Sequence, residues 1–294
     1  MSDTATNRTT SPFARALSNA AANLSDSEDD GSVCSGSIGQ KPQRYESQDL
    51  TPRGILAPGA GYFSFLNPNT LKDVTVYYIK SKKYRKAKPP VFVFHGVFRN
   101  PDIYRDAWVD LAEDHGFFIV APLFSEDQFP GSQGYNLGNI FVSESDRTST
   151  AERTWSYHIP GVVFDFLAAK GDTTAPGYMA YGHSAGSQFL HRKVAITPDP
   201  RMLLCIASNA GWYTMPTRAD LWPYGWGGFE ESGISLHDQF LSDYLTAPLI
   251  VQLGKRDIDK KHKNLRYPPP SPLLILMCFI VNIISFDVSL SPPA

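Results

Sequence analysis

Short apolar runs, separated by segments with helical spacing, constrain the fold of this sequence most. They lie at 91–94, 117–121, 178–181, 202–207 and 248–253, and a further strand is predicted at 73–79. Runs of this length with few polar residues are typical of strands buried on both faces, as in parallel sheets. The sequence therefore predicts an α/β fold whose mostly parallel central sheet is covered by helices on both faces.

Two helices are predicted with recognisable ends. The first covers 102–115 and is stopped by Gly116, because glycine readily adopts the left-handed conformation that ends helices. The second covers 152–169, begins at a candidate capping box formed by Ser149 and Glu152, and is expected to be kinked or broken at Pro160-Gly161.

The composition divides the chain into three parts. Residues 1–50 hold nine serines, four threonines and two aromatic residues, so they are expected to form a disordered polar tail. Residues 51–266 are expected to form the folded domain. Residues 267–294 hold six prolines and a 14-residue apolar segment at 273–286. That segment is shorter than the roughly 17–25 residues of a membrane-spanning helix, so no membrane association is expected, with a tail anchor as the alternative.

The charged residues and the cysteines exclude several classes of protein. The 27 Lys and Arg nearly balance the 29 Asp and Glu, which argues against a nucleic-acid-binding protein. Cys34, Cys205 and Cys278 are far apart, so they provide neither a disulfide framework nor a zinc site. The first 30 residues have no continuous apolar segment of the kind found in signal peptides, so we expect a cytoplasmic protein. The oligomeric state stays open.

The segment Gly182–Gly186 reads Gly-His-Ser-Ala-Gly and follows one of the apolar runs. A G-x-S-x-G sequence between a strand and a helix is typical of a nucleophile elbow, in which a sharp turn lifts the serine hydroxyl out of the sheet edge. Side chains at Gly182 and Gly186 would collide with neighbouring backbone in such a turn. Ser184 is therefore the predicted nucleophile, with an inert serine in a glycine-rich turn as the alternative.

Two further segments fit the same chemistry. His95-Gly96-Val97 follows the run 91–94, where an oxyanion hole would take one amide N–H from Val97 and the other from Ala185. An ordinary strand-end turn is the alternative. Asp257 follows the run 248–253 and would orient a catalytic histidine. Asp259 is the alternative acid, and either residue could be an ordinary surface carboxylate.

Together these residues resemble the α/β-hydrolase superfamily, and more closely its esterases similar to polyhydroxybutyrate depolymerases and feruloyl esterases. The resemblance covers roughly residues 60–260 and also rests on the segments 135–139, 209–216, 222–225 and 254–257. It implies a serine carboxylic-ester hydrolase that forms an acyl-enzyme on Ser184, needs no cofactor or metal, and acts on a small-molecule or polymeric ester. Tyr135, Trp212 and Tyr213 could line the substrate pocket, with ordinary packing as an equal alternative.

The sequence departs from this family at the catalytic histidine. His262 is the only histidine after Asp257, and it lies in a basic segment. We name His262 as the general base on this ground. The family's final helix and strand also have no convincing counterpart, so we expect the final helix–strand unit to be missing and the C-terminus to be truncated or replaced. A catalytically inactive hydrolase-fold protein with a binding or regulatory role is the alternative function.

Overall fold

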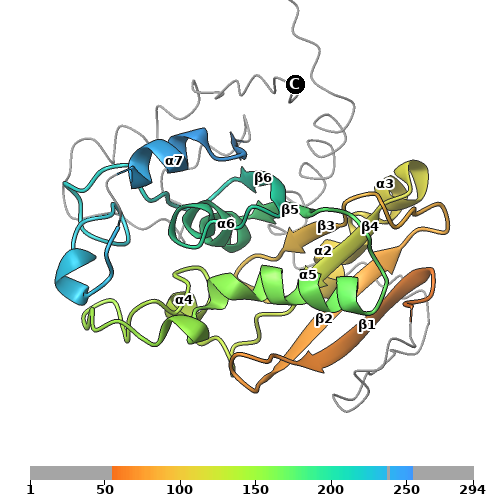
Figure 1. Cartoon of the computed structure of the whole chain (residues 1–294), viewed down its shortest axis with the longest axis horizontal. Helices are drawn as coiled ribbons and strands as arrows, with labels where there is room; N and C mark the ends of the chain where they lie inside the picture. The colour runs from red at the N-terminus through yellow and green to blue at the C-terminus, as the bar shows by residue number, and fades with distance from the viewer. Residues whose placement is uncertain (1–54, 237–238, 254–294) are drawn as a thin grey trace, which may run out of the picture.

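The computed structural model describes residues 55–236 and 239–253, and these form a seven-stranded sheet with helices on both faces (Figure 1). The expected fold class is confirmed. The strands are β1 (Gly59–Leu66), β2 (Asp73–Lys80), β3 (Val91–Phe94), β4 (Phe118–Pro122), β5 (Tyr178–His183), β6 (Met202–Ser208) and β7 (Leu249–Gln252).

The spatial order of the strands is β1-β2-β4-β3-β5-β6-β7. β1 pairs antiparallel with β2, and β2 pairs antiparallel with β4, whereas the other neighbours are parallel. The chain runs from β3 to β4 on one side and then crosses to β5 on the other. β3 and β5 therefore flank the point where the direction of winding reverses, and ligands of open α/β sheets bind at the carboxyl ends of the strands at such a point.

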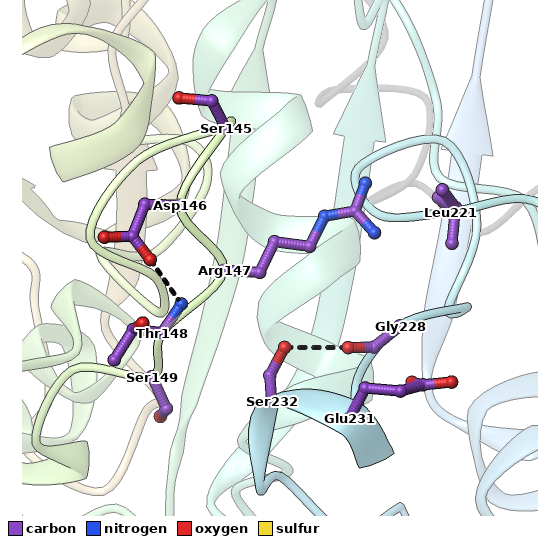
Figure 2. A pocket seen from close by; sticks show the side chains of 9 residues that line it. All are labelled: Ser145, Asp146, Arg147, Thr148, Ser149, Leu221, Gly228, Glu231 and Ser232. Carbon is purple, nitrogen blue, oxygen red and sulfur yellow. Dashed lines mark hydrogen bonds between the residues drawn. The ribbon is translucent and has the colours of Figure 1, made fainter.

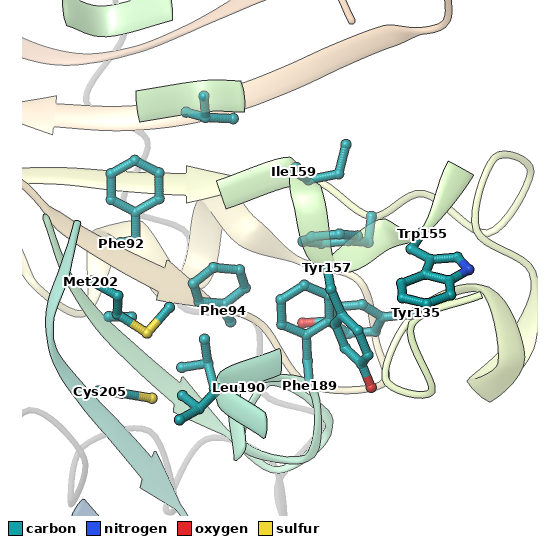
Figure 3. Packing of buried hydrophobic residues seen from close by; sticks show 14 of the residues in the cluster. Phe92, Phe94, Tyr135, Trp155, Tyr157, Ile159, Phe189, Leu190, Met202 and Cys205 are labelled. Carbon is teal, nitrogen blue, oxygen red and sulfur yellow. The ribbon is translucent and has the colours of Figure 1, made fainter. Parts of the chain in front are cut away.

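Successive side chains of the central strands point to opposite faces of the sheet. A hydrophobic core therefore forms on each face. Phe92 and Phe94 of β3 face the larger core, whereas Val91 and Val93 face the other. The helices α5 (Ile159–Ala169) and α6 (Ala185–Ile196) cover the larger core, whose aromatic and aliphatic side chains interdigitate in Figure 3. The helices α2 (Pro101–Asp106) and α3 (Val109–His115) cover the second core. All four residues of β3 are buried because the strand is covered on both faces.

The helix predicted over 102–115 is two helices, α2 and α3, separated at Ala107 and Trp108. Trp108 has φ −103° and ψ 3°, which is not helical, and its side chain is fully buried against Tyr181 at 5.1 Å between ring centroids. Burial of this indole interrupts the helix at Trp108. This is a tertiary effect that the spacing of apolar residues in the sequence cannot predict. Gly116 does end the second helix, with φ 64°.

The helix predicted over 152–169 starts later than expected. Two 3₁₀ turns precede it, and α5 begins at Ile159. Pro160 therefore lies in the first turn, where a missing N–H costs least, and does not interrupt the helix, contrary to expectation. Ser149 donates its hydroxyl to the Thr150 carbonyl, so the expected capping box does not form. Trp155 lies between the two turns and Tyr157 in the second, and both large side chains are buried, which favours the irregular path.

Three elements were not expected from the sequence. β1 is rich in glycine and lacks a clear strand pattern, and α4 (Gly131–Gly134) and α7 (Phe240–Thr246) are short. β7 is half-buried where a buried strand was expected. The predicted tails 1–50 and 267–294 and the proposed missing helix–strand unit lie outside the described residues. In the part of the chain that is described, no helix combines the length and apolarity needed to cross a membrane.

A buried ion pair ties distant parts of the chain together. Lys80 at the end of β2 donates from Nζ to Asp172 Oδ1 at 2.7 Å, and their side chains are 7% and 1% exposed. The backbone N–H of Leu56 donates to the same carboxylate oxygen at 2.8 Å, and Nζ also donates to the Leu56 carbonyl at 3.2 Å. The pair therefore fastens the first described residues to the antiparallel side of the sheet.

Replacing Asp172 should destabilise the protein strongly. Asp172→Ala leaves the Lys80 ammonium buried without its carboxylate, so the free energy of unfolding should fall by about 3–5 kcal/mol. Urea denaturation followed by tryptophan fluorescence measures the change. Glu230→Ala is the matched control, because its ion pair with Arg218 is exposed and should contribute less than about 1 kcal/mol. Equal effects of the two substitutions would contradict the assigned role of the buried pair.

Candidate active site

Ser184 stands at the sharp turn between β5 and α6. Its backbone has φ 53° and ψ −117°, and a positive φ is uncommon for a residue with a side chain. Such strain costs about 1–3 kcal/mol and persists only where the surroundings enforce it. Ser184 is half-buried, and no hydrogen bond within the described residues reaches its Oγ. Ser184 thus lies at the carboxyl end of β5 with its hydroxyl unbonded within the described residues, and its role as nucleophile stays a prediction.

The flanking glycines leave no room for side chains. A Cβ on Gly182 would lie 2.4 Å from the backbone of Gly186, and a Cβ on Gly186 would lie 2.2 Å from the carbonyl oxygen of Phe94. Real Cβ atoms do not approach backbone that closely. The first turn of α6 therefore packs directly on the end of β3, and the collisions expected from the sequence are confirmed.

Hydrogen bonds fix this turn to its neighbours. The Ser184 amide donates to the Ser208 carbonyl at the end of β6 at 3.1 Å. The His183 imidazole Nδ1 lies 3.2 Å from the Tyr104 hydroxyl, which joins β5 to α2. Contacts from β6 and from α2 thus hold the turn in place. They help to keep the strained backbone of Ser184 in its conformation.

Two amides at this edge are available to an oxygen anion. Ala185 is the first residue of α6, and its N–H belongs to the first turn, where no intrahelical acceptor exists. Val97 follows the end of β3 and its side chain is 49% exposed. Across residues 55–236 and 239–253, neither N–H donates a hydrogen bond. β3 and β5 are adjacent and parallel, so the turns that carry these amides leave the same edge of the sheet.

His95 fixes the turn that carries Val97. Its Nε2 accepts a hydrogen bond from the Phe124 amide at 3.1 Å, so the proton is on Nδ1, which faces the Gly96 carbonyl at 3.0 Å. The Tyr135 hydroxyl donates to the His95 carbonyl at 2.8 Å. Burial lowers the pKa of His95 to about 3, so the ring is neutral. His95 therefore links the backbone at Gly96 to the backbone at Phe124. This role was not identified from the sequence.

Arg99 anchors the other end of the same turn. Its guanidinium donates to the carbonyls of Phe124, Phe129 and Gly131 at 2.5, 3.2 and 2.9 Å. It also lies 4.6 Å from the ring centroid of Tyr135, a distance at which a cation is attracted to an aromatic face. These contacts hold the turn that carries Val97, whose amide is the predicted oxyanion donor, against the connection that follows β4.

The three aromatic residues suggested for a substrate pocket lie in different environments. Tyr135 is fully buried and Trp212 is 4% exposed. Trp212 stacks on the buried guanidinium of Arg192, with 4.0 Å from Cζ to the ring centroid. Tyr213 is half-buried, and its hydroxyl accepts from the Ala210 amide at 3.2 Å. Tyr135 and Trp212 thus make packing contacts of the kind that the sequence left as the alternative, and a pocket role stays a prediction for all three residues.

Arg192 is a structural residue that sequence reasoning missed. It is fully buried in α6, and its Nε donates to Thr214 Oγ1 at 2.8 Å. Its Nη1 donates to the Asn136 carbonyl at 3.0 Å. It therefore joins the helix behind Ser184 to the connections that follow β4 and β6. No signal was readable in advance, because a charged residue in a helix is ordinarily exposed.

Two of the described histidines are excluded as the general base by their hydrogen bonds. His95 uses both ring nitrogens on backbone, as described above. His191 Nε2 accepts from the Thr214 amide at 3.0 Å, and its Nδ1 faces the Ser187 carbonyl at 2.9 Å. Burial holds the pKa of His191 well below its usual value. The predicted base, His262, lies outside the described residues, as does His237.

The predicted acid Asp257 and its alternative Asp259 also lie outside the described residues, but the strand that leads to them does not. Ser208 of β6 is in register with His183 of β5 and with Gln252 of β7. The ends of β5 and β7 are therefore level and two strand spacings apart, about 10 Å. Among the described residues, no group of three or more His, Cys, Asp or Glu side chains could hold a metal ion.

The comparisons with known proteins support the fold. No family model and no curated protein sequence matches the chain. Among solved structures, poly(aspartic acid) hydrolase-1 from Sphingomonas sp. KT-1 matches with a TM-score of 0.66 and 37% identity, covering 73% of this chain and 78% of that one. A poly(3-hydroxybutyrate) depolymerase from Bordetella parapertussis matches with a TM-score of 0.65 and 29% identity, covering 75% and 72%.

Gly186→Ala should destabilise the fold, because its Cβ would overlap the Phe94 carbonyl. We expect the free energy of unfolding to fall by about 2–3 kcal/mol, as for other overpacked sites. Chemical denaturation measures this. Ser187→Ala is the control: Ser187 is buried next to Gly186, and its hydroxyl has no hydrogen-bond partner within the described residues, so its loss should change stability by less than about 1 kcal/mol. A neutral Gly186→Ala would contradict the assigned contact.

His95 should make stability depend on pH. The pKa of His95 is about 3 in the folded protein because burial disfavours the cation, against about 6.5 when unfolded. Between these values the unfolded chain binds the extra proton, so the free energy of unfolding falls as the pH is lowered from 6.5 toward 3. His95→Gln removes the group that takes up this proton. The slope of the free energy of unfolding against pH should therefore decrease by about 1.4 kcal/mol per pH unit. Equal slopes for both proteins in urea titrations would show that His95 does not contribute.

Proposed function

The chain belongs to the α/β-hydrolase superfamily, and we propose that it is a serine carboxylic-ester hydrolase that forms an acyl-enzyme on Ser184. The observation that carries the proposal is the strained, half-buried Ser184 beside two amides that have no acceptor among the described residues. A hydroxyl and two amide donors at one sheet edge are the groups that acyl transfer requires.

In the proposed reaction, Ser184 Oγ attacks the substrate carbonyl and its proton passes to His262. The amides of Val97 and Ala185 bind the oxyanion, at the positive end of α6 where negative charge is favoured. Asp257 orients the imidazole and stabilises its cation. The alcohol leaves with the proton, and water then hydrolyses the ester on Ser184. The level ends of β5 and β7 support this proposal, because Asp257 follows the last residue of β7 by five positions in the sequence.

The similar enzymes guide the choice of substrate. One is named for poly(aspartic acid), a polymer that carries a carboxylate on each unit, and the other for poly(3-hydroxybutyrate), a neutral polyester. We propose that this chain also acts on an extended or polymeric substrate, through the ester or related acyl bonds that a serine nucleophile can attack.

An inactive hydrolase-fold protein with a binding role is the second proposal. It is favoured by one observation in the sequence, that His262 is the only histidine after Asp257. The hydrogen bonds of His95 and His191 add weight, because neither ring nitrogen of these residues faces Ser184. Turnover separates the two proposals.

Ser184→Ala should abolish turnover of short p-nitrophenyl esters. We expect a loss of about four orders of magnitude or more in kcat, since removing the nucleophile leaves only binding and oxyanion stabilisation. Release of p-nitrophenol measures the rate, and the unfolding midpoint of the variant shows that the fold is intact. Wild-type protein with no turnover above Ser184→Ala would contradict the enzyme proposal and favour the binding role.

The same assay tests the proposed base. His262→Ala should lower kcat by about three to four orders of magnitude, whereas His237→Ala should leave it within about threefold. If the pattern is reversed, His237 is the base and the assignment of His262 is wrong.

A further inference from the structure

A cavity of about 690 Å³ lies between the connections that follow β4 and β6 (Figure 2). One wall is the segment 145–149, and the other is formed by residues between 221 and 232. Most of its lining residues are polar or charged. It holds serine and threonine hydroxyls, one guanidinium and two carboxylates, with Leu221 as its large apolar residue.

The strand order places this cavity at the carboxyl edge. β3 and β5 lie between β4 and β6, so the two connections leave the sheet on either side of the strands that carry Val97 and Ser184. Both connections start at carboxyl ends, at Pro122 and Ser208. Since both connections begin at the edge to which Ser184 belongs, we take the cavity between them as the region into which a long substrate extends from the reacting carbonyl.

The walls of the cavity are anchored. Phe141 pairs with Ser149 in an isolated bridge, and its ring contacts Phe229 at 5.4 Å between centroids. Arg147 donates from Nη2 to the Trp222 carbonyl at 3.1 Å. Ser232 donates to the Gly228 carbonyl at 2.8 Å on the opposite wall. The cavity is thus held by contacts between the two connections as well as within each.

Arg147 is the cation of this cavity. It is half-buried, and no carboxylate of the described residues lies within 4 Å of its guanidinium. The Asp146 carboxylate is used within its own loop, where it accepts from the Thr148 amide at 3.0 Å, and this bond lowers the pKa of Asp146. Glu231 lies exposed on the rim. The remaining N–H groups of Arg147 form a planar fork suited to a carboxylate.

We infer that Arg147 binds a carboxylate of the substrate and so selects acyl compounds that carry a negative charge several bonds from the reacting carbonyl. The inference rests on the proposed function and names its substrate class. It distinguishes acidic polymers or oligomers from neutral polyesters: a neutral chain gives the guanidinium no charge to pair with, whereas a carboxylate forms charge-assisted hydrogen bonds there.

The test compares esters that differ only in that charge. The substrates are mono-p-nitrophenyl esters of adipate and suberate and their counterparts capped as methyl esters. The ratio of kcat/KM for the acidic to the capped ester should fall by about 10- to 100-fold in Arg147→Gln, the loss expected for hydrogen bonds to a charged group. Arg147→Lys, which keeps the charge, should retain more of the ratio than Arg147→Gln.

Arg153→Gln is the matched control, because Arg153 lies in the same connection, is exposed and does not line the cavity. Its ratio should match the wild-type ratio. An unchanged ratio in Arg147→Gln, or an equal fall in Arg153→Gln, would overturn the inference.

A binding measurement separates this inference from the proposed function. Calorimetry of Ser184→Ala with suberate, and of Ser184→Ala combined with Arg147→Gln, needs no turnover. Suberate binding that weakens at least tenfold without Arg147 supports the inference even if no ester is hydrolysed. Binding that does not depend on Arg147 overturns it even if the esters are hydrolysed.

Discussion

Ser184 keeps a backbone conformation with φ 53° because the first turn of α6 is pressed onto the end of β3. Gly182 and Gly186 permit this approach, and the Phe94 carbonyl lies where a Cβ of Gly186 would be. The contact joins the two central strands at their carboxyl ends. This contact fixes the position of the serine hydroxyl and the direction of the Ala185 amide. The geometry of the candidate active site therefore depends on it.

The second half of the edge is held by a separate network. Neutral His95 spaces the turn after β3 from the Phe124 backbone, while Tyr135 and Arg99 tie that turn to the connection after β4. Arg192 fastens the same connection to α6. These hydrogen bonds link the strained serine and the turn that carries Val97 to the same connection, as the proposed oxyanion hole requires, because preorganised donors stabilise developing charge without moving.

The sequence predicted the parts of this arrangement that depend on local patterns. The apolar runs identified the buried strands, and the Gly-His-Ser-Ala-Gly segment identified the elbow. It did not predict the break at Trp108, the late start of α5 or the strand β1, because each depends on packing partners far away in the chain. The pairing of Lys80 with Asp172 and the burial of Arg192 were unreadable for the same reason. Tyr135 is an example. The sequence singled it out for the substrate pocket, but it did not predict that its hydroxyl donates a hydrogen bond to the His95 carbonyl.

The proposed function requires that Ser184 is an activated nucleophile in the folded chain. The most direct measurement is mass spectrometry of the protein after brief treatment with a fluorophosphonate, which reacts with activated serines. We expect one adduct, on the peptide that contains Ser184, formed by the native protein and absent when the protein is unfolded first. A native protein that stays unmodified, or that carries its adduct on another residue, would show that Ser184 is not the activated nucleophile.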